Sequence, residues 1–520
     1  MAVTANKHRP RGAGPALALP FLVLACAPSA QALDWRLEPN VRASATYTDN
    51  ANSSATDPQD ALILTVTPGF SLRSEGSRRV QASLQYGLTA VSRFGEDNSN
   101  DLYHRLSGIG KAELVEDFLF IDGSAHISQE LISLLGPTAD AETNDSNRTT
   151  VGTYSISPYI QQRLGTFANA LVRYTNSGAI FENNTAANSS INSLAARLNS
   201  GTRFTDLSWA LDYSIRKAEN RKAATTAANS DTTFERASAT VGYALTRKFR
   251  LFGTVGQDWN DYLSTTDTDG SFYSAGFGWS PTRRTSVEAS AGKRYFGDTF
   301  SFSGSHRTRM TRWTVRYSED VSDITQQFLE QTSRIFWDCN GTLVEAQQNP
   351  GACVGPITAG QLALFFADYG FSTADLVAAG LLNVASANGV YIIKSLTAGV
   401  TWDIGRLEFG LSAQDTRRLY QALGDAEDHI QGVTGSVSYR MTPRTMASGS
   451  LSLTRTSIDS LLTPGAARED DRMILSLGLN HRFAEKLNGA LTLRHTQRDS
   501  NAPNSDYDVN SITATVNMGF

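Results

Sequence analysis

A strict alternation of apolar and polar residues recurs along almost the whole chain and limits its fold more than any other feature. One example runs through Leu207, Trp209, Leu211, Tyr213 and Ile215, with small or polar residues between them. Because successive side chains of a strand point to opposite faces, this period of two predicts strands with one apolar and one polar face. Further runs of this kind begin at Val41, Leu62, Val80, Ala237, Tyr273 and Met473.

Two kinds of connection alternate between these runs. One kind is short and often basic, as at 246–249 and 280–285, and the other is long and rich in Asn, Asp, Ser and Thr, as at 134–149 and 217–231. Short turns at one end and long loops at the other are typical of a transmembrane β-barrel. A β-propeller would repeat at a similar spacing but needs four strands per repeat, whereas each period here holds two. We therefore predict an all-β fold, an antiparallel up-and-down transmembrane barrel of about 22 strands, within a range of about 18 to 24.

The last strand-like segment carries apolar residues at every second position. It resembles the C-terminal signal that the outer-membrane barrel assembly machinery of Gram-negative bacteria reads, although a soluble protein can also end in a strand. A closed barrel needs such a strand to seal its edge. The residues of this expected assembly signal are Ile512, Ala514, Val516, Met518 and Phe520.

Residues 1–32 have the organisation of a secretory signal peptide. Lys7, Arg9 and Arg11 form a basic region, 16–25 is apolar and too short to span a bilayer, and the cleavage site is expected near Ala32. An alternative is lipoprotein processing at Cys26. We expect Sec-type export, a barrel over 33–520 and a location in the outer membrane.

Charge and residue pattern indicate the surroundings of the barrel. The net charge is −5, and removal of the three basic residues of 1–32 makes it −8, which disfavours nucleic acid as a partner. Lipid and lipopolysaccharide are the expected contacts of the apolar faces. The opposite faces, for example Gln81, Ser83 and Gln85 in one strand and Asp212 and Arg216 in another, are expected to line a polar lumen.

Four tryptophans lie close to short turns. In a barrel this depth is the periplasmic interface, where amphipathic rings collect into a girdle. The alternative is that aromatic residues simply favour strands. The members of the expected periplasmic girdle are Trp209, Trp279, Trp313 and Trp402, and Trp259 is expected in an outer girdle beside a long loop.

The segment 318–388 interrupts the regular pattern. We expect it to be one long, partly helical extracellular loop, with helix-like stretches at 361–369 and 373–382. It holds Cys339 and Cys353, and a disulfide between them would close a loop of about 15 residues, contributing ~3 kcal/mol in an oxidising compartment. The segment is either a surface excursion or a lid or constriction of the lumen.

No arrangement of residues indicates catalysis. The histidines are scattered over different hairpins, and no nucleophile elbow or metal-binding motif occurs. We therefore expect no enzyme activity, metal or cofactor, although a barrel enzyme with groups converging from separate strands stays an alternative. A siderophore receptor would need a long plug ahead of its first strand. Basic turns such as Arg78-Arg79 and Arg283-Arg284 are interpreted as turn and interface chemistry rather than a ligand site.

One run resembles a known family. Lys293-Arg294-Tyr295-Phe296-Gly297, followed by the stretch from Ser305 to Ser318 with its sequence SHRTRMTRWTVRYS, is similar to the outer-membrane β-barrel family associated with PEP-CTERM/exosortase systems. The resemblance implies a role near exopolysaccharide export, with polysaccharide export components as partners, and no catalytic residues. The functional hypothesis is therefore a porin-like outer-membrane pore or conduit for exopolysaccharide, with a structural, surface-organising barrel as the alternative.

Overall fold

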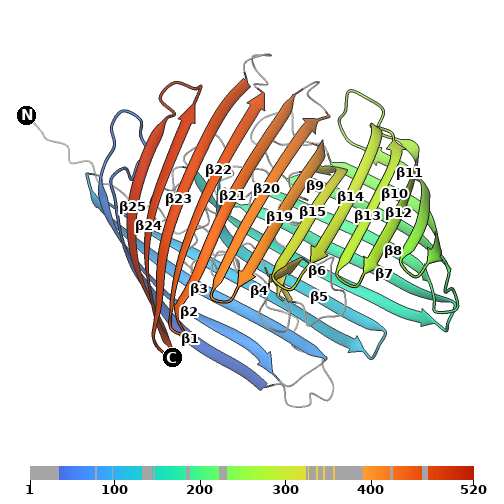
Figure 1. The fold of residues 1–520 in the computed structure, drawn as a ribbon, viewed down its shortest axis with the longest axis horizontal. Helices are drawn as coiled ribbons and strands as arrows, with labels where there is room; N and C mark the ends of the chain where they lie inside the picture. The colour runs from blue at the N-terminus through green and yellow to red at the C-terminus, as the bar shows by residue number, and fades with distance from the viewer. Residues whose placement is uncertain are drawn as a thin grey trace, which may run out of the picture.

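Twenty-two strands form one closed antiparallel sheet (Figure 1). The computed structural model describes residues 34–75, 79–96, 98–131, 143, 147–182, 188–221, 231–323, 326, 335–337, 343–345, 355–357, 390–421, 426–459 and 467–520. The first half of the wall comprises β1 (Asp34–Thr48), β2 (Ala61–Glu75), β3 (Val80–Gly95), β4 (Ser99–Val115), β5 (Leu119–Leu131), β6 (Arg148–Leu164), β7 (Ala168–Phe181), β8 (Asn188–Ser200), β9 (Leu207–Arg221), β10 (Thr232–Thr246) and β11 (Phe249–Asp261). The second half comprises β12 (Gly270–Thr282), β13 (Thr285–Arg294), β14 (Gly297–Arg307), β15 (Thr311–Asp323), β19 (Val390–Ile404), β20 (Leu407–Tyr420), β21 (Glu427–Thr442), β22 (Thr445–Asp459), β23 (Ala467–Ala484), β24 (Leu487–Ser500) and β25 (Tyr507–Gly519).

The two ends of the sheet pair with each other. Strand β25 lies antiparallel to β1, from Asn40 opposite Gly519 to Thr48 opposite Ser511. The backbone N–H of Phe520 extends this pairing by donating to the carbonyl oxygen of Pro39 at 2.9 Å. Every other strand pairs with its neighbours in sequence. The structure thus confirms the predicted antiparallel up-and-down barrel and its strand number.

Short and long connections lie at opposite ends of the barrel. Because consecutive strands run in opposite directions, the turns after β2, β4 and every second strand share one end with both chain termini of the sheet. At this short-turn end β19 and β20 are joined by Gly405 and Arg406 alone, and Gly405 has a φ of 64°, a conformation that glycine adopts without strain. The predicted short turns and long loops are therefore correctly separated.

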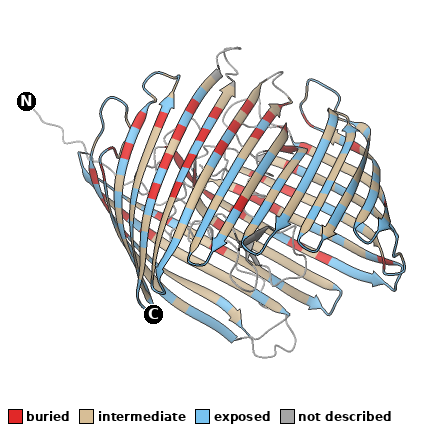
Figure 2. Cartoon of the chain, in the orientation of Figure 1, coloured by how far each residue is buried: buried red, intermediate tan, exposed pale blue. Residues whose placement is uncertain are grey.

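The outer surface of the wall is apolar. In β2 the side chains of Leu62, Leu64 and Val66 point away from the barrel and are exposed, while the intervening Ile63 and Thr65 point inward and are buried. The same alternation is visible on most strands in Figure 2. A continuous apolar exterior is suited to lipid, and this is the fold of a transmembrane β-barrel of the outer-membrane type. Within the described part of the chain, no helix is long and apolar enough to span a membrane.

The inner wall differs between the two ends of the barrel. At the short-turn end it is polar and exposed, and the predicted lumen residue Gln81 lies there. Toward the loop end the inner side chains are buried on most strands, and several are apolar. Ile63, Val91, Val151, Ile191, Ile430 and Ile474 belong to this buried set. The expected polar lumen is therefore found at the short-turn end, and toward the loop end buried polar side chains such as Thr65, Arg93 and Asp470 are interspersed with the apolar ones.

A seam lies above the shortest hairpin. Strands β13 and β14 have only 10 and 11 residues, and β14 pairs with β15 only as far as Phe302 opposite Tyr317, so residues 318–323 of β15 are not paired with β14. Tyr262, which follows β11, closes the gap by packing against Val321, Val390 and Ile392. Its ring stacks on Phe234 of β10 at 5.3 Å between centroids, and its hydroxyl is 2.8 Å from that of Tyr295. The loop ends of β10 and β11 therefore pack against the loop ends of β15 and β19.

The long insertion starts later than expected. Residues 318–323 belong to β15, which pairs with β19 as far as Asp323 opposite Val390. The described part of the insertion includes a small sheet of three strands, β16 (Ile335–Trp337), β17 (Leu343–Glu345) and β18 (Gly355–Ile357). Cys339, Cys353 and the two helix-like stretches lie outside the described residues, so the disulfide and the partly helical character stay predictions.

Candidate functional site

Two neighbouring short turns bring basic residues together. Residues 283–284 join β12 to β13, and residues 308–310 join β14 to β15. Strands β13 and β14 pair from Thr285 opposite His306 onward, so the two turns are adjacent along the short-turn rim. The N–H of Arg307 donates to the carbonyl oxygen of Arg284 at 2.8 Å and joins the two turns directly.

Threonine hydroxyls shape both turns. The Oγ1 of Thr282 accepts the N–H of Arg284 at 3.2 Å and donates to Oγ1 of Thr285 at 3.1 Å. Thr308 does the same in the next turn, where its Oγ1 accepts the N–H of Thr311 at 2.9 Å. A hydroxyl that bonds the backbone two or three residues further on substitutes for a backbone turn hydrogen bond. The threonine hydroxyls therefore stabilise these turns, and the arginine side chains are not needed to hold the turn backbone.

The same chemistry recurs at another turn of the rim. Between β21 and β22, the Oγ1 of Thr442 accepts the N–H of Arg444 at 3.2 Å and donates to Thr445 at 2.9 Å. Thr445 then contacts Nδ1 of His481 at 2.9 Å, as Thr285 contacts Nδ1 of His306 at 2.8 Å. The Thr-x-Arg-Thr turn thus occurs twice in this barrel. The turn that contains Arg444 can therefore be compared with the two adjacent turns that contain Arg284 and Arg309.

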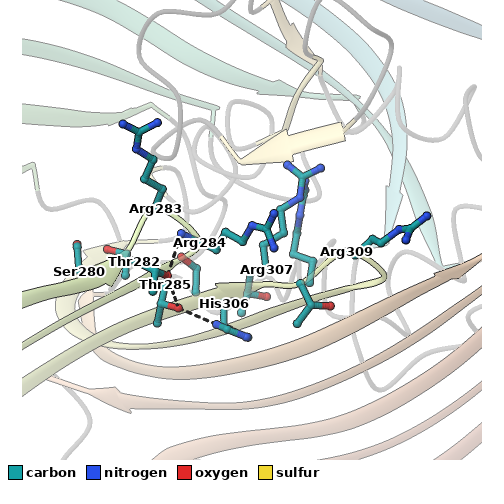
Figure 3. A pocket seen from close by; sticks show the side chains of 13 residues that line it. Ser280, Thr282, Arg283, Arg284, Thr285, His306, Arg307 and Arg309 are labelled. Atoms are coloured by element: carbon teal, nitrogen blue, oxygen red, sulfur yellow. Dashed lines mark hydrogen bonds between the residues drawn. The ribbon is translucent and has the colours of Figure 1, made fainter.

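A cavity of about 790 Å³ lies over the two turns. Figure 3 shows Arg283 and Arg309 on its two sides, with Thr285 and His306 joined by their hydrogen bond. Five arginines, one histidine and seven serines or threonines line it, and no carboxylate does. The lining residues are Ser280, Thr282, Arg283, Arg284, Thr285, Ser286, Ser305, His306, Arg307, Thr308, Arg309, Arg312 and Thr314.

Two of these arginines oppose each other on the inner face of the wall. Arg307 of β14 lies directly opposite Arg312 of β15. The next residue, Trp313, is exposed on the outer face, so Arg312 and its partner Arg307 face the lumen. Like charges directly opposite on paired strands destabilise a sheet, which means that this pair costs stability unless something else compensates it.

The cavity arginines lack compensating carboxylates. None of Arg283, Arg284, Arg307, Arg309 and Arg312 forms an ion pair with any residue that the structure describes. Arg250 nearby behaves differently, because it is paired with Glu288 of β13. The cavity is therefore a concentration of positive charge lined with hydroxyl groups.

Sequence analysis identified the basic turns but not their convergence. It interpreted Arg283-Arg284 as turn chemistry, and the hydrogen bonds of Thr282 agree with this for the backbone. The available signal was register: with β13 and β14 forming one hairpin, Arg284 and Arg307 must lie side by side. The alternating pattern does not show where that hairpin begins and ends, so the proximity of Arg284 and Arg307 was not predicted.

The four tryptophans of the expected periplasmic girdle all lie at the short-turn end and point outward. Trp313 and Trp402 come from neighbouring strands, with ring centroids 5.8 Å apart, and Trp209 packs against Phe167 and Phe204. Trp279 lies on β12 and is exposed. Sequence analysis missed Trp35, an exposed fifth tryptophan on β1 at the same end. The anchoring role of these rings stays a prediction.

The remaining predicted residues lie apart from the cavity. Ile512, Ala514, Val516 and Met518 form the outer face of β25, and the side chain of Phe520 is exposed. Histidines pair singly, as His104 does with Tyr86 and His429 with Asp415, both at 2.8 Å. Among the described residues, no group of three or more His, Cys, Asp or Glu could hold a metal ion.

Comparisons with known proteins return structures only. No family model matches the sequence, and no curated protein matches it. The fold is similar to the siderophore receptor PirA from Pseudomonas aeruginosa, with 9% identity, a TM-score of 0.47 and coverage of 93% of this chain and 80% of that one. PirA from Acinetobacter baumannii gives 8%, 0.48, 93% and 80%. The FrpB iron transporter from Neisseria meningitidis gives 10%, 0.47, 93% and 82%.

Proposed function

We propose that this chain is a conduit of the bacterial outer membrane that serves exopolysaccharide export in a PEP-CTERM-type system. One observation carries the conduit: the inner wall is polar and exposed at the short-turn end but buried toward the loop end. A 22-stranded barrel encloses a lumen wider than its own side chains fill. Water and solutes can thus enter from the side of the short turns, and passage depends on what covers the buried inner wall.

The substrate assignment is supported by the family resemblance. The run from Lys293 to Gly297 and the stretch from Ser305 to Ser318 carry it, and these residues form the end of β13, the two ends of β14, the β14–β15 turn and part of β15. The resemblance therefore falls on the same two hairpins as the arginine cavity. Components of polysaccharide export would then be partners on the periplasmic side, with lipopolysaccharide around the outer rim and the barrel assembly machinery needed for insertion.

The second candidate is a structural barrel that transports nothing. It is favoured by the same buried inner wall, because a permanently closed barrel would also bury those side chains. The two candidates differ in what happens when the long insertion is removed. Asp323 and Val390 are directly paired on β15 and β19, so a short turn can join them without distorting the wall.

The experiment compares conductance in planar bilayers. The full chain is expected to conduct little, and a variant with 324–389 replaced by a short Gly-containing turn is expected to conduct in steady large steps. A matched control replaces 460–466 in the same way, between the paired residues Asp459 and Ala467, and should behave as the full chain does. Deletion of the gene should reduce secreted polysaccharide without stopping growth.

The conduit is refuted by a shortened barrel that folds and does not conduct, together with normal secretion in the deletion strain. That outcome establishes the structural barrel. Conductance with normal secretion would retain the conduit and remove exopolysaccharide as its cargo.

A further inference from the structure

We infer that the arginine cavity at the short-turn mouth binds a multivalent oxyanion, a molecule that presents carboxylate or phosphate groups at two or more points. The cavity consists of the residues that line the space over the β12–β13 and β14–β15 turns. The inference extends the proposed function, because it names the class of material that the mouth of the conduit recognises. Binding itself is independent of whether the barrel conducts.

Positive charge is concentrated in the cavity. Arg307 and Arg312 face each other across paired strands, and Arg283, Arg284 and Arg309 border the same space. No carboxylate of a described residue neutralises any of them. Guanidinium groups bind carboxylates and phosphates through paired hydrogen bonds in a fixed geometry. An oxyanion between Arg307 and Arg312 would convert their repulsion into two favourable contacts.

The rest of the lining specifies a hydrophilic anion. Ser280, Ser286, Ser305 and Thr314 alternate with the outward side chains and add hydroxyl donors to the inner face. No aromatic or aliphatic side chain belongs to the lining, so a neutral sugar held by ring stacking finds no platform. The volume of about 790 Å³ accommodates more than a single inorganic ion, and five cations call for several negative charges.

The two opposed arginines of the cavity face away from the lipid. Trp313 and Trp279 on the outer face are exposed where lipid would be, whereas Arg312 and Arg307 occupy the opposite face of the same strands. A phosphate that reaches them must come from the lumen or from the periplasmic space. The ligand is therefore a soluble polyanion or a polyanionic chain.

The surrounding rim supports capture from the periplasm. Five consecutive short turns, from β10–β11 to β21–β22, contain Arg247, Lys248, Arg283, Arg284, Arg309, Arg406 and Arg444 and no acidic residue. Asp403 and Glu408 lie beside these turns on the β19–β20 hairpin, outside the cavity. Turns that carry charge of one sign concentrate ligands of the other sign and speed their association. Of these five turns, only the β14–β15 turn is flanked by arginines directly opposite each other, Arg307 and Arg312, which distinguishes a binding site from a general field.

The test measures binding by calorimetry with the purified full-length barrel in a neutral detergent without phosphate. The probes are tripolyphosphate and tetragalacturonate, with maltotetraose as the neutral comparison. We expect at least one polyanion to bind and maltotetraose not to bind, with affinity falling as salt rises because the charges are exposed to solvent. Arg307→Gln and Arg312→Gln are each expected to weaken binding about tenfold or more, as loss of a charge-assisted hydrogen bond does.

Arg444→Gln is the matched control, because it changes an arginine in the same Thr-x-Arg-Thr turn outside the cavity. It should change affinity less than about threefold. Binding of tripolyphosphate alone assigns phosphate, binding of tetragalacturonate alone assigns a carboxylated sugar chain, and binding of both assigns oxyanion charge in general. The inference is wrong if neither binds, or if Arg444→Gln loses as much affinity as Arg307→Gln.

Thermal unfolding without ligand separates a binding role from a structural one. Because Arg307 and Arg312 repel each other, Arg307→Gln should leave the unfolding temperature unchanged or raise it. Tripolyphosphate or tetragalacturonate should stabilise the unsubstituted barrel and the Arg444→Gln variant more than the Arg307→Gln variant. A lower unfolding temperature for Arg307→Gln in plain buffer would make the arginines structural and overturn the inference. Polyanion binding by the full chain, when the variant with 324–389 replaced does not conduct and the deletion strain secretes normally, would uphold this site and refute the conduit. Conductance by that variant without polyanion binding by the full chain would do the reverse.

Discussion

Replacing Asp470 by asparagine is expected to destabilise the barrel far more than the same replacement at the next residue, Asp471. Both carboxylates lie on β23, where Asp470 pairs with Arg498 and Arg468 and Asp471 pairs with Arg455. Asp470 faces inward, where it is 1% exposed and contacts Arg498 at 2.6 Å. Asp471 faces outward and contacts Arg455 at 2.7 Å, with side chains 50% and 59% exposed.

The expected magnitudes follow from burial. Asp470→Asn leaves the guanidinium of Arg498, only 2% exposed, without its carboxylate in a place that water does not reach. Removing one partner of a buried pair costs about 3 to 5 kcal/mol. An exposed pair such as Asp471 with Arg455 contributes about 0.2 to 1 kcal/mol. The two variants should therefore differ by at least ~2 kcal/mol in unfolding free energy.

The assay is urea unfolding of the purified barrel in detergent, followed by tryptophan fluorescence and by the gel shift between folded and heated protein. Raised salt should weaken the contribution of Asp471 and leave that of Asp470 unchanged, because screening acts on exposed charges. Equal unfolding free energies for the two variants would refute the reasoning, since the opposite burial of neighbouring residues is its only basis.

Three further outcomes are expected. Tyr262→Ala should cost about 3 to 5 kcal/mol of unfolding free energy by opening the seam over Val321 and Val390, and hydrogen exchange should become faster at the loop end of β15. Tyr262→Phe removes only the hydrogen bond to Tyr295 and should cost about 1 kcal/mol. Equal stability of all three proteins would count against the seam. Cys339 and Cys353 should be bridged in protein taken from the membrane, which mass spectrometry of unreduced peptides decides, and two free thiols there would contradict it. Removing Phe520, which bonds Pro39 across the closing strands, should leave unfolded protein in the periplasm, and heat-modifiable barrel in the outer membrane would show that the residue is dispensable.

The fold was predictable because the pleat places alternate side chains of every strand on the face that contacts lipid. Leu207, Trp209 and Leu211 alternate with polar residues because each strand has one face in lipid, and this signal survives without any knowledge of neighbours. Ile63 and Ile474 were not predictable in the same way. Their inward position follows from parity, but their burial depends on side chains of other strands, as Ile63 packs with Val91 and Tyr103, and a pattern along one strand does not contain these contacts.

The candidate site could be predicted only in part for a related reason. The turn at Thr282 is held by hydrogen bonds of the threonine hydroxyl to residues of the same turn, and a Thr-x-Arg-Thr sequence predicts it directly. The opposition of Arg307 and Arg312 depends on where the β14–β15 turn falls, and a shift of one residue would send both side chains to the lipid. Tyr262 was missed because its partners, Val321 and Val390, are far away in sequence and meet it only where β13 and β14 end.

The pairing of β1 with β25 limits how a barrel of this kind can change its size during evolution. Thr46 and Thr513 lie 467 residues apart and share a hydrogen bond between their hydroxyls, so the first and last strands are matched to each other residue by residue. Adding one strand at either end would break this match and would make two neighbours parallel. If this match is kept, strands can be gained or lost only between β1 and β25, and only as whole hairpins.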